Sequence, residues 1–579
     1  MLPGAGVLAL ALVARLAGIT RTDVWADEAS TLMLIRASWQ DLLVRLHRGS
    51  DHPPLSFLLF KAWGLASDGE AWMRLLPALM GAAAAGVLMR VARGQHPRAA
   101  LPTGLLAAVS PVPVHYGQEL RCYSLLFLLA ALTLWAAQRA AGRPVSISGR
   151  NTPNHSRPAP LAGDGDPGDP NAARPSARAA VALLSCLGAL AAYTHAVGMF
   201  VWPMGAGFLL TWTGRHGARS LFRPAGLPLW LILIAPMLWW NVHLSASHRQ
   251  GWWIPPLDVS NARQYAGEYL GLNVVEQWER SRLPRPVWTA FVLERLLMLG
   301  PGVLCASALL NRSTRRAAGA ALAATAAYVG LLELSSLLAV RGVLVRTLLP
   351  GWAPMLLLMG LGAAGANGEH RPAVSLKSPR RCRAGLIRAL CAGAPRAALG
   401  VVAGLCVVGW LWFAWAGPPR RPPCRAAFEW IRASLGRHDV VVFTTAGLEE
   451  LTAYYLGDVV PVARMIGPNL PQVAGAPPVR RMIGNIDDPN SHARLRAALA
   501  GARRAGGGDY NVWCLEFGTI RGPEPGNFHE VLRERHALAA EFSGEDVRGV
   551  AAARYVPLRA AVTPSPATAA ATAAENGRW

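Results

Sequence analysis

Long apolar stretches alternate with short, arginine-rich polar segments over residues 1–416. Leu2–Ile19, Trp72–Val91, Ala99–His115 and Ala317–Val340 each approach the ~20 residues that an α-helix needs to cross a bilayer, and we expect Ala99–His115 to run outward as a single span. Leu55–Leu65 is apolar but too short to cross, so we expect a re-entrant or interfacial segment there. The pattern predicts a mainly α-helical, polytopic membrane protein with roughly 11 spans, and at most about 13.

The arginines between the apolar stretches indicate the orientation. Short loops rich in Lys and Arg stay on the cytoplasmic side of a membrane. The clearest clusters are Arg90–Arg98, Arg143–Arg178 and Arg371–Arg396. Placing all three inside puts the N-terminus inside as well, and leaves everything after Gly417 outside the cytoplasm.

Two connecting segments and the C-terminal part differ in composition from the spans. Residues 142–178 are rich in Pro, Gly and Asp with few large apolar side chains, which predicts a disordered cytoplasmic loop. Residues 242–288 are expected to form a polar outer loop. The pattern of residues 417–559 predicts a small extracytoplasmic α/β domain. The Ala/Pro/Thr-rich tail, 560–579, should be disordered. The expected helices and strands of this domain are Ala426–Leu435, Asp439–Thr444, Leu448–Leu456, Tyr510–Glu516 and Ala553–Leu558.

The outer domain holds two cysteines, Cys424 and Cys514. An extracytoplasmic compartment permits a disulfide between them. Two isolated thiols account for the sequence equally well, so both alternatives stay open.

Overall composition supports the membrane assignment. The chain is 52% hydrophobic and 16% charged, whereas soluble domains carry roughly 25% charged residues. The formal net charge of +23 could suggest nucleic-acid binding. Because the arginines lie between apolar stretches, we assign the charge to membrane orientation and expect no nucleic-acid partner.

Two adjacent carboxylates, Asp27 and Glu28, follow the first apolar stretch directly. Carboxylates at a membrane exit are costly and usually mark a site; a solvated loop is the ordinary alternative. In extended backbone two adjacent side chains point to opposite sides, so we expect only one to face a substrate. Asp27 is the candidate general base, and Glu28 would position it or hold a cation.

Further polar residues should share the outer face with these acids. Arg121 and Arg346 are candidate phosphate clamps, and Arg346 stands inside an apolar stretch, although it could also extend to lipid phosphates. His195 could simply cap a helix turn. A divalent cation held by Asp27, Glu28 and His52 is a further expectation. The remaining candidates on this face are Glu119, Tyr123, Trp252, Trp253 and Arg341.

These motifs, in this order, resemble the bacterial glycosyltransferase family 39 group. This group is similar to protein O-mannosyltransferases and lipid A aminoarabinose transferases, within the C-type membrane glycosyltransferases. The resemblance covers about residues 1–365 and departs from the common pattern at Leu120, Ala196 and Thr347. The motifs that carry it are Trp25–Glu28, His52–Leu55, Gln118–Leu125, Tyr193–His195, Trp253–Pro256 and Arg346–Pro350.

The resemblance implies transfer of a sugar from a polyprenyl-phosphate donor to an acceptor hydroxyl, with inversion, outside the bacterial cytoplasmic (inner) membrane. The acceptor could be a lipid, a glycan or a protein. No glycine-rich nucleotide-binding pattern is found, which favours a lipid-linked donor. The competing class is a transporter or flippase for a lipid-linked sugar, but the sequence shows no internal repeat of the transporter type. A structural scaffold would explain neither the paired acids nor Arg346.

Overall fold

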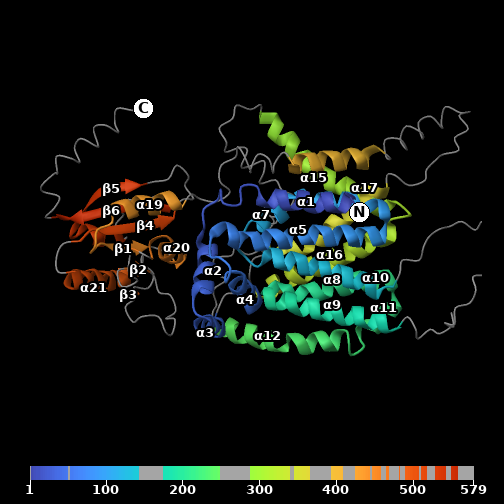
Figure 1. Ribbon diagram of the computed structural model, residues 1–579, viewed down its shortest axis with the longest axis horizontal. Helices are drawn as coiled ribbons and strands as arrows, with labels where there is room; N and C mark the ends of the chain where they lie inside the picture. Colours follow the sequence, from blue (N-terminus) through green and yellow to red (C-terminus); the bar gives the residue numbers. More distant parts are fainter. Residues whose placement is uncertain are drawn as a thin grey trace, which may run out of the picture. The chain divides into compact units, whose positions relative to one another are not determined.

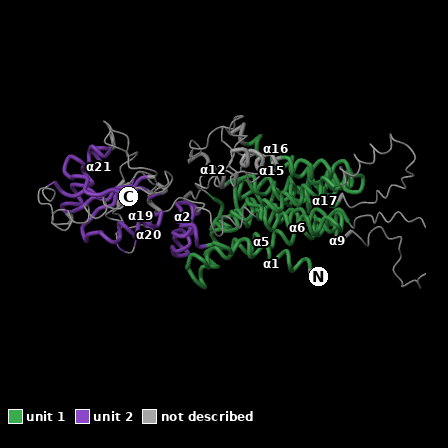
Figure 2. Tube along the Cα trace, turned by 90° about the horizontal axis from the view of Figure 1, so that it is seen from above, with its two compact units in different colours: residues 1–19, 49–418 green, residues 20–48, 419–579 purple. Residues whose placement is uncertain are grey.

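The computed structural model of the chain describes residues 2–49, 52–142, 174–247, 287–339, 345–365, 393–407, 424–443, 446–457, 459, 465–467, 481–482, 489–506, 510–517, 528–542 and 550–558. These residues form two compact units, coloured separately in Figure 2. Unit 1 contains residues 1–19 and 49–418, and unit 2 contains residues 20–48 and 419–579. The sequence pattern alone places residues 20–48 in the membrane region, whereas the structure groups them with unit 2. The predicted domain limits at 416 and 559 stay a prediction.

Unit 1 is a bundle of apolar helices (Figure 1). Its main core is one cluster of buried side chains contributed by helices from α1 to the last described helix of the unit, and a smaller cluster joins α9 to α12. The elements are α1 (Leu2–Leu16), α4 (Pro54–Trp63), α5 (Glu70–Gln95), η1 (Pro97–Ala99), α6 (Ala100–Val109), α7 (Pro111–Gly117), α8 (Tyr123–Ala140), α9 (Arg174–Thr194), η2 (Ala196–Phe200), α10 (Val201–Thr213), α11 (Arg215–Leu221), α12 (Leu227–Ser247), α15 (Val287–Leu310), α16 (Arg315–Ala339), η3 (Val345–Leu348), α17 (Leu349–Gly365) and the helix Gly393–Val407.

Six helical stretches in the described residues are long and apolar enough to cross a membrane. Four shorter apolar helices accompany them, Pro3–Leu16, Leu227–Trp239, Leu299–Leu310 and Gly393–Val407. The predicted polytopic, mainly helical membrane fold is thereby confirmed, while the count of roughly 11 spans stays a prediction. The six stretches are Glu70–Gln95, Tyr123–Ala140, Ala177–Thr194, Ala196–Thr213, Arg315–Ser335 and Arg346–Ala364.

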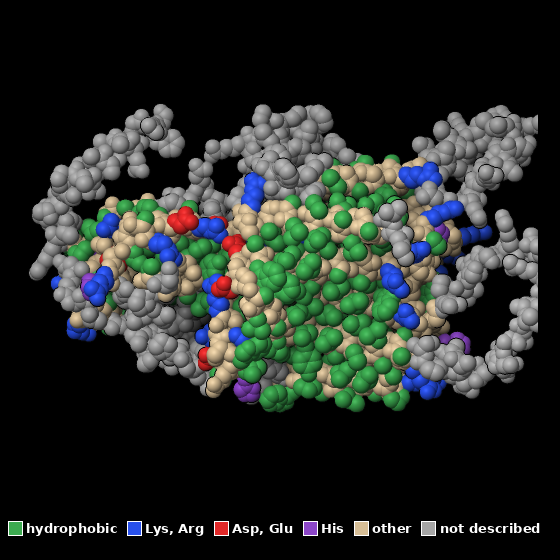
Figure 3. Space-filling view, in the orientation of Figure 1, with side chains coloured by type: hydrophobic (Ala, Val, Ile, Leu, Met, Phe, Trp, Pro, Cys, Tyr) green, Lys and Arg blue, Asp and Glu red, His purple; other side chains and the backbone are tan. Residues whose placement is uncertain are grey.

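The two ends of the unit 1 bundle differ in the charged side chains that they carry. Apolar side chains cover its flank, and Lys and Arg side chains gather at the end where α10 and α11 lie (Figure 3). Because helices joined by short loops run antiparallel, these arginines share one end of the bundle, as the positive-inside pattern requires. Exposed arginines at helix ends are Arg90, Arg93, Arg98, Arg139, Arg219, Arg223, Arg312, Arg315 and Arg316.

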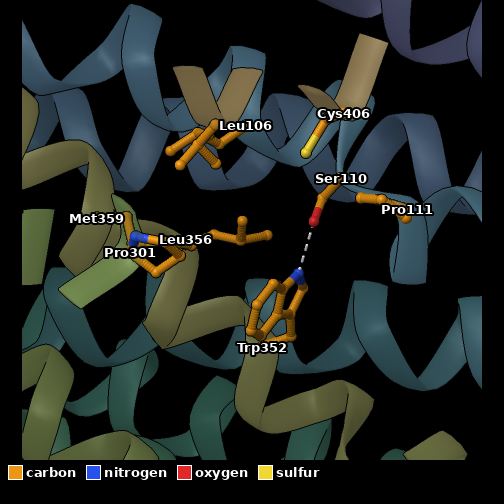
Figure 4. A pocket seen from close by; sticks show the side chains of 9 residues that line it. Leu106, Ser110, Pro111, Pro301, Trp352, Leu356, Met359 and Cys406 are labelled. Carbon is orange, nitrogen blue, oxygen red and sulfur yellow. Dashed lines mark hydrogen bonds between the residues drawn. The ribbon is translucent and has the colours of Figure 1, made fainter. Parts of the chain in front are cut away.

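One expected span is interrupted. The apolar stretch Ala99–His115 was expected as a single outward span, but the structure divides it into α6 and α7 at Ser110. Pro111 is the physical reason, because proline has no N–H for the helix ladder and keeps the preceding residue out of helical conformation. Ser110 accordingly has ψ 129°, and its hydroxyl accepts a hydrogen bond from Trp352 Nε1 of α17 at 3.0 Å (Figure 4).

Unit 2 contains a six-stranded mixed sheet with strand order β3-β2-β1-β4-β6-β5. β1 pairs in parallel with β2 and β4, and β6 pairs antiparallel with β4 and β5. The predicted strands β1, β4 and β6 are present; β2, β3 and β5 were not predicted. The elements are α2 (Ala26–Arg36), α3 (Trp39–Gly49), α19 (Arg425–Ser434), β1 (Val440–Phe443), α20 (Ala446–Leu456), β2 (Met465–Gly467), β3 (Arg481–Met482), α21 (Pro489–Gly506), β4 (Val512–Phe517), α22 (Phe528–Arg533), β5 (His536–Phe542) and β6 (Val550–Pro557).

Two aspartates stabilise unit 2. Asp23 Oδ2 accepts the backbone N–H groups of Cys424 and Arg425, both at 2.9 Å, and so caps the start of α19. Asp439, buried before β1, accepts the indole N–H of Trp513 at 2.8 Å and the backbone N–H of Asn511 at 3.0 Å. The second carboxylate therefore links the beginnings of the neighbouring strands β1 and β4.

The two cysteines of unit 2 are free in the structure, so the disulfide alternative is not formed. Cys514 packs in the apolar core of the sheet, whereas Cys424 precedes α19, where its backbone N–H binds Asp23. We expect peptide mapping without reduction to find both thiols free in protein taken from the membrane. A Cys424–Cys514 peptide in that map would contradict this prediction.

Candidate active site

Four chain segments converge at the end of unit 1 opposite its exposed arginines. His52 precedes α4, Arg121 lies in the turn before α8, His195 joins α9 to η2, and Arg346 lies in η3. α4 and α7 lie at this end in Figure 1, and α8 runs from here to the exposed Arg139 at the other end. The structure thus brings together four of the predicted site residues from positions almost 300 residues apart.

The side chains of these segments touch one another. Arg121 Nη2 lies 2.5 Å from His52 Nε2, and the rings of His52 and His195 have centroids 4.9 Å apart. Tyr123 packs against His195 with centroids 5.8 Å apart. The guanidinium carbon of Arg346 lies 5.9 Å from the centroid of the Tyr123 ring, in cation–π geometry. We call these five residues the arginine–histidine cluster.

Local hydrogen bonds hold the turn that carries Arg121. Its backbone N–H donates to the carbonyl of Glu119 at 2.7 Å, and the Ser124 hydroxyl donates to the carbonyl of Tyr116 at 2.8 Å. On the other side, the Tyr328 hydroxyl donates to the carbonyl of Thr347 at 2.7 Å, next to Arg346. Both guanidinium groups therefore extend from backbone that is constrained by its neighbours.

The two histidines are neutral at physiological pH. His195 is buried, and its Nδ1 accepts the backbone N–H of Val197 at 3.2 Å, which leaves any ring proton on Nε2. Burial, followed by the charges of Arg346 and Arg121, lowers the pKa of His195 to about 3. Burial first, then Arg121, His195 and Arg346, also holds the pKa of His52 well below its usual value. The positive charge of the cluster therefore comes from the two arginines.

This charge favours an anion over a metal ion. The ligand atoms of His52, Cys122 and His195 lie within 4.8 Å of one another, a spacing that could hold a cation. However, His52 Nε2 already faces the guanidinium of Arg121, whose positive charge repels a cation at this place. Of the cation ligands expected from sequence, Asp27, Glu28 and His52, only His52 belongs to this group.

Asp27 and Glu28 belong to unit 2, where both lie in the first turn of α2. The expectation of extended backbone at these acids is wrong, because Trp25 is the N-cap and the helix begins at Ala26. Their side chains are therefore about 100° apart around the helix axis, and Glu28 is fully buried whereas Asp27 is half-buried. Negative charge at a helix N-terminus is favoured by the helix dipole.

The other candidates have different positions. Glu119 is buried in the turn that precedes Arg121. Trp252, Trp253 and Arg341 lie outside the described residues. Sequence reasoning missed the place of Cys122 beside the histidines. Its only signal was its position within the Gln118–Leu125 motif.

Comparison with known proteins bears on the family and the fold of the chain. Residues 51–146, which include His52, Arg121 and Tyr123, match the family model described as dolichyl-phosphate-mannose-protein mannosyltransferase. A search of curated protein sequences found no match. The chain is similar to the crystal structure of ArnT from Cupriavidus metallidurans bound to undecaprenyl phosphate, with a TM-score of 0.51 at 14% identity over 95% of this chain and 97% of that chain.

Two further structures are more distant. The archaeal oligosaccharyltransferase AglB from Archaeoglobus fulgidus, in complex with an inhibitory peptide and a dolichol-phosphate, gives a TM-score of 0.42 at 13% identity, covering 97% of this chain and 75% of that chain. The arabinofuranosyltransferase AftD from Mycobacteria gives 0.44 at 15% identity, covering 96% of this chain and 39% of that chain. The similarity to ArnT shows that the chain shares the fold of that protein, which is consistent with the resemblance inferred from the motifs.

Proposed function

We propose that this protein is a membrane glycosyltransferase that takes its sugar from a polyprenyl-phosphate donor. The arginine–histidine cluster carries the proposal, because two guanidinium groups beside two neutral histidines form a site for an anion at one end of a membrane bundle. The similarity to ArnT, whose structure holds undecaprenyl phosphate, supports the choice of a lipid phosphate.

The chemistry follows from the charges. The anomeric carbon of the donor passes through an oxocarbenium-like state as its bond to the phosphate oxygen breaks. Arg121 and Arg346 stabilise the negative charge that develops on the leaving phosphate, so no general acid is needed. A carboxylate on the opposite face of the sugar takes the proton of the acceptor hydroxyl, and attack from that face inverts the anomeric centre.

Asp27 is our candidate for that carboxylate. It follows Ile19 of unit 1 by eight positions, and Gln118, three residues before Arg121, donates a hydrogen bond from Nε2 to the carbonyl of Ala17 at 2.8 Å. Within unit 1, the chain just after α1 is therefore anchored beside the turn that carries Arg121. The acceptor on which Asp27 would act is a lipid, a glycan or a protein hydroxyl.

The direct test is sugar release. Purified protein in detergent should convert radiolabelled polyprenyl-phosphate sugar into free polyprenyl phosphate and glycosylated acceptor. A flippase instead moves the intact labelled lipid between the leaflets of a vesicle without cleaving it. Movement without any release, by protein that binds the donor, would exclude the proposed function.

Membrane orientation gives a second test, since the proposal places the arginine–histidine cluster on the outer face. A reporter active only in the periplasm should be active when fused after Trp415 and silent when fused at Asn154. The expectation rests on the exposed arginines at the other end of unit 1. The reverse pattern of activity would move the cluster to the cytoplasmic face and contradict the proposal.

A further inference from the structure

Helix α1 carries a fully buried arginine, Arg15, that the sequence analysis did not single out. A guanidinium among apolar helices is costly unless its donors are paired. Nη1 of Arg15 donates to the carbonyl oxygens of Ala11 at 2.8 Å and Ala108 at 3.1 Å, and Nη2 donates to that of Ala107 at 3.2 Å. The partners of Arg15 in these three hydrogen bonds are therefore all backbone carbonyl oxygens.

The two carbonyls of α6 lack helical donors because of the proline break. In a continuous helix the Ala107 oxygen would accept the N–H of residue 111, but Pro111 has none. Ala108 lies in the last turn of α6, which ends at Val109, so its oxygen has no helical partner either. Arg15 supplies both donors, and its positive charge is favoured at a helix C-terminus.

The side chain of Arg15 also contacts the end of α7. A Cβ atom on Gly117 would lie 2.8 Å from Arg15 Cδ, and one on Gly81 of α5 would lie 2.5 Å from Arg15 Nε. A side chain at either of these two positions would force the Arg15 side chain to shift. Gly117 is the last residue of α7, and the turn 118–122 follows it directly.

We propose that Arg15 is a positioning residue for the cluster. By joining α1 to the break between α6 and α7, and by packing on Gly117, it sets the place of the turn 118–122 and therefore of Arg121. Trp352, which binds Ser110 at the same break, connects it to α17, the helix that follows Arg346. The consequence for donor binding rests on the proposed function, whereas the placement of the turn does not.

Cys122 reports on this turn without reference to catalysis, because its side chain is only 4% exposed. Arg15→Met removes the hydrogen-bond donors and puts a long, unbranched apolar side chain in the place of the arginine. In the detergent-solubilised full chain, we expect maleimide to modify Cys122 at least ten times faster than in the wild type, by peptide mass mapping. Cys406, equally buried in the helix Gly393–Val407, should react at its wild-type rate.

Donor kinetics of Arg15→Met and a control variant on the same helix test the same proposal. The KM for the donor should rise about tenfold in Arg15→Met, with a smaller change in kcat, because a displaced Arg121 weakens phosphate binding. Gly6→Ala is the control on the same helix, since a Cβ there would meet no atom within 4 Å. It should leave thiol reactivity and kinetics unchanged.

Three outcomes would overturn the proposal. They are an unchanged Cys122 rate in Arg15→Met, an equal rise at Cys122 and Cys406, and a rise in Gly6→Ala as large as in Arg15→Met. If Arg15→Met yields no folded protein, Gly117→Ala takes its place: it should displace Arg15 and accelerate Cys122 alone, and an unchanged rate would overturn the proposal. If the wild type turns over no donor, the proposed function fails, but the thiol rates still decide the role of Arg15.

Discussion

Asp27→Asn should abolish sugar transfer while leaving donor binding intact. The amide keeps the shape of the side chain but cannot accept the proton of the acceptor hydroxyl. Loss of a general base typically costs about 10²- to 10⁴-fold in rate. The measurement is pre-steady-state transfer with saturating donor and acceptor, together with a separate measurement of donor affinity.

Glu28→Gln is the matched control for this prediction. Glu28 is adjacent in sequence but fully buried, and its side chain points about 100° away from Asp27 around the axis of α2. We expect a milder loss of rate from this variant. If Asp27→Asn retains more than about a tenth of the wild-type rate, well above what loss of a base allows, Asp27 is not the base. Glu119 becomes the next candidate.

Loss of either cluster arginine should weaken donor binding strongly. A hydrogen bond to a charged group contributes about 1.5–3 kcal/mol, so Arg121→Ala and Arg346→Ala should each reduce affinity for the lipid-phosphate donor by about 10- to 100-fold. Arg346→Lys should be nearly as damaging, because an ammonium cannot reproduce the planar fork of a guanidinium. Donor affinity and turnover in detergent measure both effects.

A control comes from the opposite end of the same helix. Arg139 ends α8, lies exposed, and places its guanidinium carbon 5.2 Å from the Trp135 ring. Arg139→Ala removes the same charge far from the cluster and should leave donor affinity unchanged. Wild-type affinity and turnover in both Arg121→Ala and Arg346→Ala would refute the assignment of the phosphate site.

Much of unit 1 could be predicted from the sequence because the requirement for a span is local. A helix in lipid must be long and apolar along its own length, so Glu70–Gln95 or Ala196–Thr213 can be recognised without reference to other segments. The proline break at Ser110 was missed, although Pro111 was visible. Apolarity alone joined Ala99–His115 into one stretch. The break is seen only in the structure, where Arg15 binds the released carbonyls of Ala107 and Ala108 and Trp352 binds the Ser110 hydroxyl.

In unit 2 the central strands were easier to predict than the outer ones. Val440–Phe443 is a run of buried β-branched and aromatic residues, which is a strong strand signal. β2 and β3 have only three and two residues, too few for any periodicity. The helical conformation of Asp27 and Glu28 was also missed, because the N-cap residue is Trp25, which is not a residue type that is preferred at helix starts.

The sequence by itself determined the membrane class, the orientation pattern of the arginines and the residue types of the proposed phosphate site, because each depends on local composition or on a short motif. Tertiary structure alone decided that Arg121 meets His52, that His195 packs beside them, and that Arg15 binds the end of α6. These contacts join residues 69, 143 and 93 positions apart. Contacts at such separations depend on how whole helices pack, which no local pattern of side chains specifies.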